Sequence, residues 1–128
     1  MKLLYIVGPF RAANQWEQEQ NIRRAESAAL QMWRLGCAVV CPHSNTRFFQ
    51  GAAPDETWLA GDLEIMRRCD AIFVLPNSQD SVGSTAEIQA AKQSGLRIFH
   101  TSEEVQEWIA GRKGRSSKGR GNGSEETQ

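Results

Sequence analysis

The sequence contains no apolar run close to the roughly 20 residues that a membrane-spanning helix needs. It has only three cysteines, an odd and small number that does not fit a disulfide framework. Acidic and basic side chains number 15 each, so the formal net charge of zero indicates no particular partner. A strand-like segment begins at the second residue, and we therefore expect no signal peptide. These absences predict a cytoplasmic protein with reduced thiols.

Metal ligands are also sparse. Cys37, Cys41 and His43 stand close together, but no fourth ligand follows at a spacing that suits zinc. Cys37 and Cys41 share one face of a strand-like segment, which favours burial in a sheet. We expect neither a metal site nor a cofactor.

Short apolar segments alternate with amphipathic ones along the chain. Strand-like composition is found at residues 2–7, 37–41, 70–75 and 96–99. Helical patterns are found at residues 14–35, 55–68 and 85–94, and a last helix is expected to begin at Ser102 without a full capping box. Asp55 is expected to cap the second of these helices. Residues 42–54 lack periodicity and are expected to form a loop over a site.

This alternation predicts an α/β fold, namely a small, doubly wound, mainly parallel sheet of the flavodoxin or Rossmann type with helices on both faces. We expect residues 1–110 to form this domain. Residues 111–128 are rich in Gly, Ser and basic side chains and are expected to be a disordered tail. The tail has no interleaved aromatic residues, so it supports only weak, unspecific contact with nucleic acid. We therefore do not expect a nucleic-acid partner.

Three informative segments follow the first three predicted strands. They are Gly8-Pro-Phe-Arg11, His43-Ser-Asn45 and residues 77–87. Ligands of such sheets bind at the carboxyl ends of the strands, where the fold brings these segments to one edge. This convergence is the main physical argument for a functional site, in which His43 and Asn45 are expected to contact a substrate.

The segment Ser81-Val-Gly-Ser-Thr-Ala-Glu87 opens a helix directly after a buried strand. The free N–H groups and dipole of a helix N-terminus favour an anion. Ser81, Gly83 and Ser84 could supply hydroxyl groups and close backbone approach to it, and Arg11 could bind a phosphate or lie on the surface. The segment indicates a sugar-phosphate ligand.

Two carboxyl groups are candidates for chemistry. Glu87 could attack an anomeric carbon and form a covalent glycosyl intermediate, or it could merely stabilise the helix dipole. Asp62 could protonate a departing base, hold a sugar hydroxyl, or be a solvated helix residue. Tyr5 could orient Glu87 or be an ordinary core residue. Asp70 and the four tryptophans, Trp58 included, are interpreted as structural.

Three motifs occur in an order that resembles a known superfamily. They are Tyr5-Ile-Val-Gly8-Pro-Phe-Arg11, an Asp62 to Asp70 pair, and Ser81-x-Gly83-x-x-x-Glu87. Together they resemble the nucleoside 2-deoxyribosyltransferase superfamily, and in particular its 2′-deoxynucleoside 5′-phosphate N-hydrolases. Residues 1–100 also resemble a group of short phage and bacterial proteins of that superfamily.

The resemblance implies a role for several residues. Glu87 would attack C1′ of the deoxyribose, Tyr5 would position it, and Asp62 would donate a proton to the leaving base. Gly8, Arg11, Ser81 and Gly83 would hold the 5′-phosphate, and the protein would be a homodimer or a larger homo-oligomer. Pro9 stands where the hydrolases have a free N–H, and Thr85 replaces a glycine. These departures leave open whether a phosphate is required.

Two functions of different classes remain at this point. The first is an enzyme that cleaves, by hydrolysis or transfer, the N-glycosidic bond of a deoxynucleoside or its 5′-monophosphate. The second is a non-catalytic domain that binds a nucleotide or nucleotide sugar. In both, the partner is a small molecule, and the sequence does not indicate the base or the acceptor.

Overall fold

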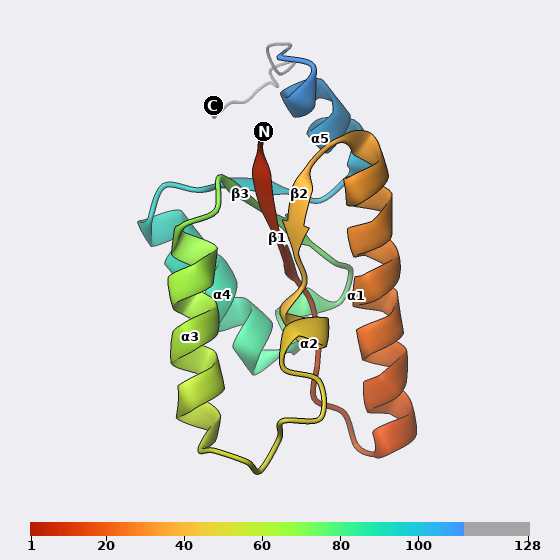
Figure 1. The fold of residues 1–128 in the computed structure, drawn as a ribbon, viewed down its shortest axis with the longest axis vertical. Helices are drawn as coiled ribbons and strands as arrows, with labels where there is room; N and C mark the ends of the chain where they lie inside the picture. The colour runs from red at the N-terminus through yellow and green to blue at the C-terminus, as the bar shows by residue number, and fades with distance from the viewer. Residues whose placement is uncertain (112–128) are drawn as a thin grey trace.

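The computed structural model describes residues 1–111 of the 128-residue chain. Its four parallel strands are β1 (Leu3–Val7), β2 (Ala38–Val40), β3 (Ala71–Val74) and β4 (Arg97–Phe99), in the order β2-β1-β3-β4. The helices are α1 (Gln15–Leu35), α2 (Pro42–Asn45), α3 (Asp55–Arg67), α4 (Val82–Gln93) and α5 (Ser102–Ile109). A short 3₁₀ helix spans Ser78–Asp80. The predicted small doubly wound α/β fold is confirmed (Figure 1).

Helices cover both faces of the sheet (Figure 1). Successive strand residues point to opposite faces, so β1 contributes to two cores. Leu4 and Ile6 belong to the cluster formed with α1 and α5. Tyr5 and Val7 belong to the cluster formed with α3 and α4. The alternation along β1 therefore decides which side chains face each helix pair.

The helix ends follow from local capping. The side chain of Asn14 accepts a hydrogen bond from the Glu17 amide and begins α1, and Gly36 ends it with a φ of 110°. The Ser81 hydroxyl accepts from the Ser84 amide, so α4 begins at Val82, three residues earlier than expected. This earlier start places Glu87 well inside the helix.

Three local expectations were wrong. Residues 42–54 do not form a loop throughout, because Pro42 begins the one-turn helix α2. Asp55 does not cap α3; it is the first helical residue and Pro54 precedes it. The last helix has a full capping box, formed by Thr101 and Glu104 rather than by Ser102.

The sheet order creates a switch point between β1 and β3, because the chain leaves these neighbours toward opposite edges of the sheet. Asp70 helps to join their starts, since its carboxylate accepts a hydrogen bond of 2.7 Å from the Leu3 amide.

No helix within residues 1–111 is both long and apolar enough to cross a membrane. The tail expected to be disordered, from Arg112 on, lies outside the described residues.

Candidate functional site

A pocket of about 730 Å³ lies at the carboxyl edge of the sheet. It is lined by the segment after β1, by α2 and the residues after it, by one side of α3, and by the segment from Pro76 through the first two turns of α4. Gly8, Arg11, His43, Asp62, Ser81, Gly83, Ser84 and Glu87 all line it. The convergence expected from the sequence is thus present in the structure.

Glu87 lines this pocket and is hydrogen-bonded to Tyr5 of β1, which does not itself line the pocket. The Tyr5 hydroxyl donates a hydrogen bond of 2.6 Å to Glu87 Oε2. Tyr5 is fully buried in the sheet, and Glu87 is only 9% exposed. Burial, and secondly the charge of Glu87, raise the pKa of Tyr5, so the phenol remains a donor at neutral pH. Tyr5 is therefore a core residue that also orients a buried carboxyl group.

The two carboxyl groups of the pocket have unusual acidities. Burial raises the pKa of Glu87 to about 7, although the hydrogen bond from Tyr5 acts in the opposite direction. The charge of Asp62 also raises it. Burial raises the pKa of Asp62 to about 6. Perturbed carboxyl groups in a cleft are typical of functional sites, and Asp62 is half-buried in the pocket wall.

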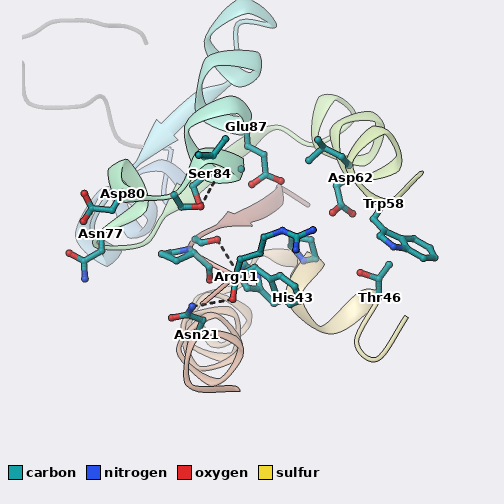
Figure 2. Close-up of a pocket in the computed structure, with 18 of the residues that line it drawn as sticks. Arg11, Asn21, His43, Thr46, Trp58, Asp62, Asn77, Asp80, Ser84 and Glu87 are labelled. Atoms are coloured by element: carbon teal, nitrogen blue, oxygen red, sulfur yellow. Dashed lines mark hydrogen bonds between the residues drawn. The ribbon is translucent and has the colours of Figure 1, made fainter. Parts of the chain in front are cut away.

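The arrangement of α3 and α4 explains how these groups meet. Both helices begin at the pocket and pack on the same face of the sheet (Figure 1). Helix side chains lean toward the N-terminus of their helix. Asp62 and Glu87 each lie within the first two or three turns, so both lean back toward the opening (Figure 2).

The start of α4 has the features of an anion site. Gly83 has open space where a Cβ would lie, which leaves its backbone accessible. The Ser84 hydroxyl is buried and has no hydrogen-bond partner among residues 1–111. The Ser81 hydroxyl already accepts the bond that caps the helix, which leaves its proton available for a ligand.

Arg11 lines the pocket, but its guanidinium is occupied. It pairs with the carboxylate of Asp55 at the start of α3, at a distance of 2.5 Å. Both side chains are more than half exposed. The pair joins the segment after β1 to α3 at the pocket wall.

The segment after β1 is held in place from two sides. His43 Nε2 lies 3.0 Å from the Gly8 carbonyl oxygen and 3.1 Å from that of Pro9, so this nitrogen carries the proton and donates. Burial lowers the pKa of His43 and favours the neutral ring. Asn21 on α1 donates to the Phe10 carbonyl at 3.1 Å. Gly8 packs closely on Leu75, since a Cβ at residue 8 would lie 2.5 Å from Leu75 Cδ1 and would force that side chain to move.

Two residues differ from the sequence-based assignment. Asn45 is exposed and is not among the residues that line the pocket. Trp58, interpreted as structural, lines it with a buried indole nitrogen that has no partner within residues 1–111. The four-residue spacing of Trp58 and Asp62, which puts both on one side of a helix, is the signal that could have revealed it.

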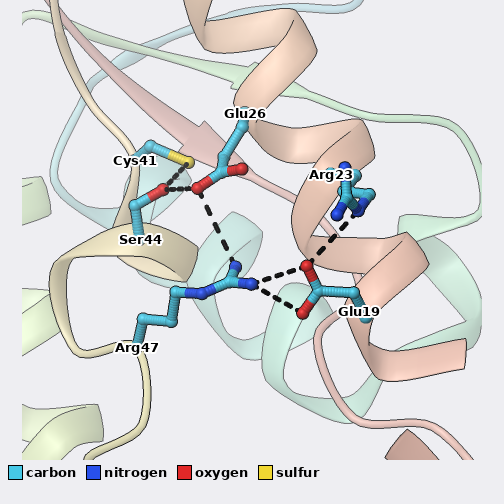
Figure 3. A network of polar contacts seen from close by, with 6 residues as sticks. All are labelled: Glu19, Arg23, Glu26, Cys41, Ser44 and Arg47. Atoms are coloured by element: carbon cyan, nitrogen blue, oxygen red, sulfur yellow. Dashed lines mark hydrogen bonds and ion pairs between the residues drawn. The ribbon is translucent and has the colours of Figure 1, made fainter. Parts of the chain in front are cut away.

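Ion pairs attach the residues after α2 to α1 (Figure 3). Arg47 binds both carboxylate oxygens of Glu19, at 2.7 and 2.5 Å. Ser44 donates a bond of 2.7 Å to Glu26. The neighbouring Thr46 and Gln50 line the pocket, so this network supports one of its walls.

Comparison with known proteins identifies the sequence family and the fold. A family model described as "Domain of unknown function (DUF7768)" matches residues 2–101. No curated protein matches the chain at a significant level.

Several solved structures have a similar fold. A 2-deoxyribosyltransferase of Bacillus psychrosaccharolyticus aligns with a TM-score of 0.60 and 21% identity, over 75% of this chain and 69% of that one. A 2-deoxyribosyltransferase of Leishmania mexicana aligns with a TM-score of 0.57 and 18% identity, over 77% of this chain and 62% of that one. The CMP N-glycosidase BcmB of Clostridium botulinum aligns with a TM-score of 0.51 and 22% identity, over 86% and 79%. The chain therefore has the Rossmann-like fold of the nucleoside deoxyribosyltransferases.

Proposed function

Because the chain belongs to the DUF7768 family, whose description assigns no activity, we propose a function from its pocket: cleavage of the N-glycosidic bond of a deoxynucleoside or deoxynucleoside 5′-monophosphate. The observation that carries this proposal is the buried Tyr5–Glu87 pair beside Asp62 at the switch point of the sheet. The solved structures of similar fold include two deoxyribosyltransferases and a CMP N-glycosidase, which supports the same chemistry.

In the proposed reaction, Glu87 is the nucleophile. A carboxylate oxygen forms a bond to C1′ as the bond from C1′ to the base nitrogen breaks. The electron pair of the broken bond stays on the base, which takes a proton from Asp62. Water or a second base then attacks C1′, gives its proton to the Asp62 carboxylate and releases Glu87, which gives hydrolysis or transfer respectively.

The acidities of the pocket determine how much of the protein is in the reactive protonation state. Between about pH 6 and pH 7 the two carboxyl groups together hold one proton. Because Asp62 is the stronger acid, the shared proton rests mainly on Glu87, and the reactive form is the minor one that has the proton on Asp62 and the negative charge on Glu87, where the Tyr5 hydroxyl stabilises it.

The remaining polar groups suit a 5′-phosphate. The first turn of α4 offers its backbone N–H groups and the hydroxyl of Ser84. Arg11 could add a guanidinium if a phosphate displaced Asp55 from it. Pro9 provides no N–H, so fewer backbone donors are available after β1 than after β3.

The test is base release, measured by chromatography from a panel of deoxynucleosides and their 5′-monophosphates. Glu87→Gln keeps the size of the side chain and an oxygen that can accept from Tyr5. It should lower the rate by at least about 10³-fold. Glu64→Gln, on the exposed side of α3, should retain the wild-type rate.

Each outcome has a definite meaning. Release that requires Glu87 supports the proposal, and the preferred panel member tells whether the phosphate is needed. Ligand binding without release by the wild type would favour a nucleotide-binding domain instead. Full activity of Glu87→Gln would rule out the glutamate mechanism.

A further inference from the structure

Trp58 has a polar atom that the proposed mechanism does not use. Its indole nitrogen is buried and has no hydrogen-bond partner within residues 1–111. A buried donor left unpaired costs about 1–3 kcal/mol, so such groups usually serve a ligand or water. The indole N–H can only donate. The ligand group that satisfies it must therefore be an acceptor.

The position of Trp58 assigns it to one end of the pocket. Trp58 precedes Asp62 by one turn on the same side of α3. Figure 2 shows Trp58, Asp62 and Thr46 to one side of Glu87, and Ser84, Asn77 and Asp80 to the other. Phe49 packs against the indole ring with centroids 5.6 Å apart, which restricts its orientation.

The two ends of the pocket differ in chemistry. With C1′ at Glu87 and the 5′-phosphate at the start of α4, the base extends toward α3. In the proposed mechanism Asp62 lies there beside the bond that breaks, and Trp58 lies one turn nearer the start of α3. This assignment rests on the proposed function and extends it to recognition of the base, for which the mechanism names no residue.

We propose that Trp58 recognises the base of the substrate: its indole N–H donates a hydrogen bond to a carbonyl oxygen or an unprotonated ring nitrogen on the edge of the base. A base that presents an amino group or a C–H at that point leaves the indole unpaired and is rejected. Asp62 thus serves bond cleavage, while Trp58 sets specificity.

Trp58→Phe tests the proposal because phenylalanine keeps an aromatic ring against Phe49 but removes the donor. For the preferred substrate, kcat/KM should fall about tenfold, the worth of one neutral hydrogen bond. Analogues that replace each acceptor of the base by C–H locate the contact. For the analogue that lacks the bonded atom, the kcat/KM of the wild type should be about tenfold lower than for the natural substrate, whereas the kcat/KM of Trp58→Phe should be almost the same for both. Trp33→Phe, at a half-exposed position on α1 outside the pocket, is the matched control.

A binding measurement separates this proposal from the proposed function. In Glu87→Gln labelled with nitrogen-15, the indole N–H signal of Trp58, assigned by its loss in Trp58→Phe, should move when the nucleotide binds. It should move far less with deoxyribose 5-phosphate, which has no base.

The outcomes are distinct. If the wild type and Trp58→Phe release base at the same rate from every substrate, recognition of the base by Trp58 is wrong and the proposed glycosidic chemistry stands. If no base is released but the Trp58 signal responds to nucleotide alone, the enzyme proposal fails and base recognition stands. If no nucleotide moves the indole signal of Trp58, recognition of the base by Trp58 is overturned.

Discussion

The two faces of the sheet are made by the same strands but bury different chemistry. Toward α1 and α5 the strands present Leu4, Ile6 and Phe73, and this core is built from apolar side chains and Cys37. Toward α3 and α4 they present Tyr5, whose hydroxyl reaches Glu87. The face covered by α1 and α5 therefore mainly stabilises the fold. The face covered by α3 and α4 contributes less stability because it buries a carboxyl group.

The largest expected effect lies on the apolar face. Met32 on α1 is fully buried, so Met32→Ala should lower the free energy of unfolding by about 2–5 kcal/mol through lost burial and a cavity. Urea titration measures this loss. Leu30→Ala, at a half-exposed position on the same helix, should change stability by no more than about 0.5 kcal/mol. If the comparison of faces is right, folded Met32→Ala protein keeps the wild-type rate of base release.

At Glu87, by contrast, we expect a substitution to raise the free energy of unfolding. Its pKa is about 7 in the folded protein, against about 4.3 in an unfolded chain. The folded state therefore holds the proton more tightly, and this group lowers stability as pH rises from about 4.3 to 7. Glu87→Gln removes the penalty and should raise the free energy of unfolding by about 1–3 kcal/mol at pH 8.

That gain should vanish near pH 4, where the wild-type carboxyl group is protonated in both states. Unfolding free energies of the two proteins at pH 4 and pH 8 check it. An equal difference at both pH values would mean that Glu87 is not buried as a charge, and the contrast between the faces would lose its main support.

How far the sequence predicts this contrast depends on the kind of feature. Alternating strand-like and helical segments predict the sheet, and the carboxyl-end rule alone places Gly8, His43 and Ser81 at one edge. Period-two alternation puts Tyr5 and Ile6 on opposite faces. These inferences succeed because they rest on local pattern and on general rules of parallel sheets.

Other features escape prediction because they depend on tertiary geometry. The pairing of Arg11 with Asp55 joins two segments 44 residues apart, which no local pattern connects. The partnerless indole of Trp58 depends on what surrounds it after folding. The Thr101–Glu104 capping box, by contrast, is a local pattern that the sequence does contain, and expecting the cap at Ser102 sets it one residue too late.

Tyr5→Phe sharpens the comparison within a single strand position. Phenylalanine fills nearly the same space in the core, so the fold should remain intact. The hydrogen bond from Tyr5 lowers the pKa of Glu87, and its removal should raise that pKa further above 7. Since the nucleophile must be ionised, base release should fall about tenfold at pH 7.

The pH profile identifies the cause. Because Glu87 must be ionised while Asp62 keeps its proton, the activity of the wild type should be highest between about pH 6 and pH 7, and its fall on the alkaline side should occur at higher pH in Tyr5→Phe. The difference in rate between the two proteins should then become small at alkaline pH. A uniform loss at every pH would assign Tyr5 to positioning Glu87 rather than to stabilising its charge.

The smallest expected effect on stability concerns the Arg11–Asp55 ion pair at the exposed rim of the pocket. An exposed ion pair such as Arg11–Asp55 contributes at most about 1 kcal/mol to stability, so Asp55→Asn should scarcely change unfolding. It frees the guanidinium, however, and should lower KM for deoxynucleoside 5′-monophosphates several-fold while leaving KM for deoxynucleosides unchanged. Glu56→Gln, the neighbouring acidic residue in the first turn of α3, is the control for a change of net charge alone. If Glu56→Gln lowered KM for the 5′-monophosphates equally, the loss of one negative charge, and not the release of Arg11, would explain the tighter phosphate binding.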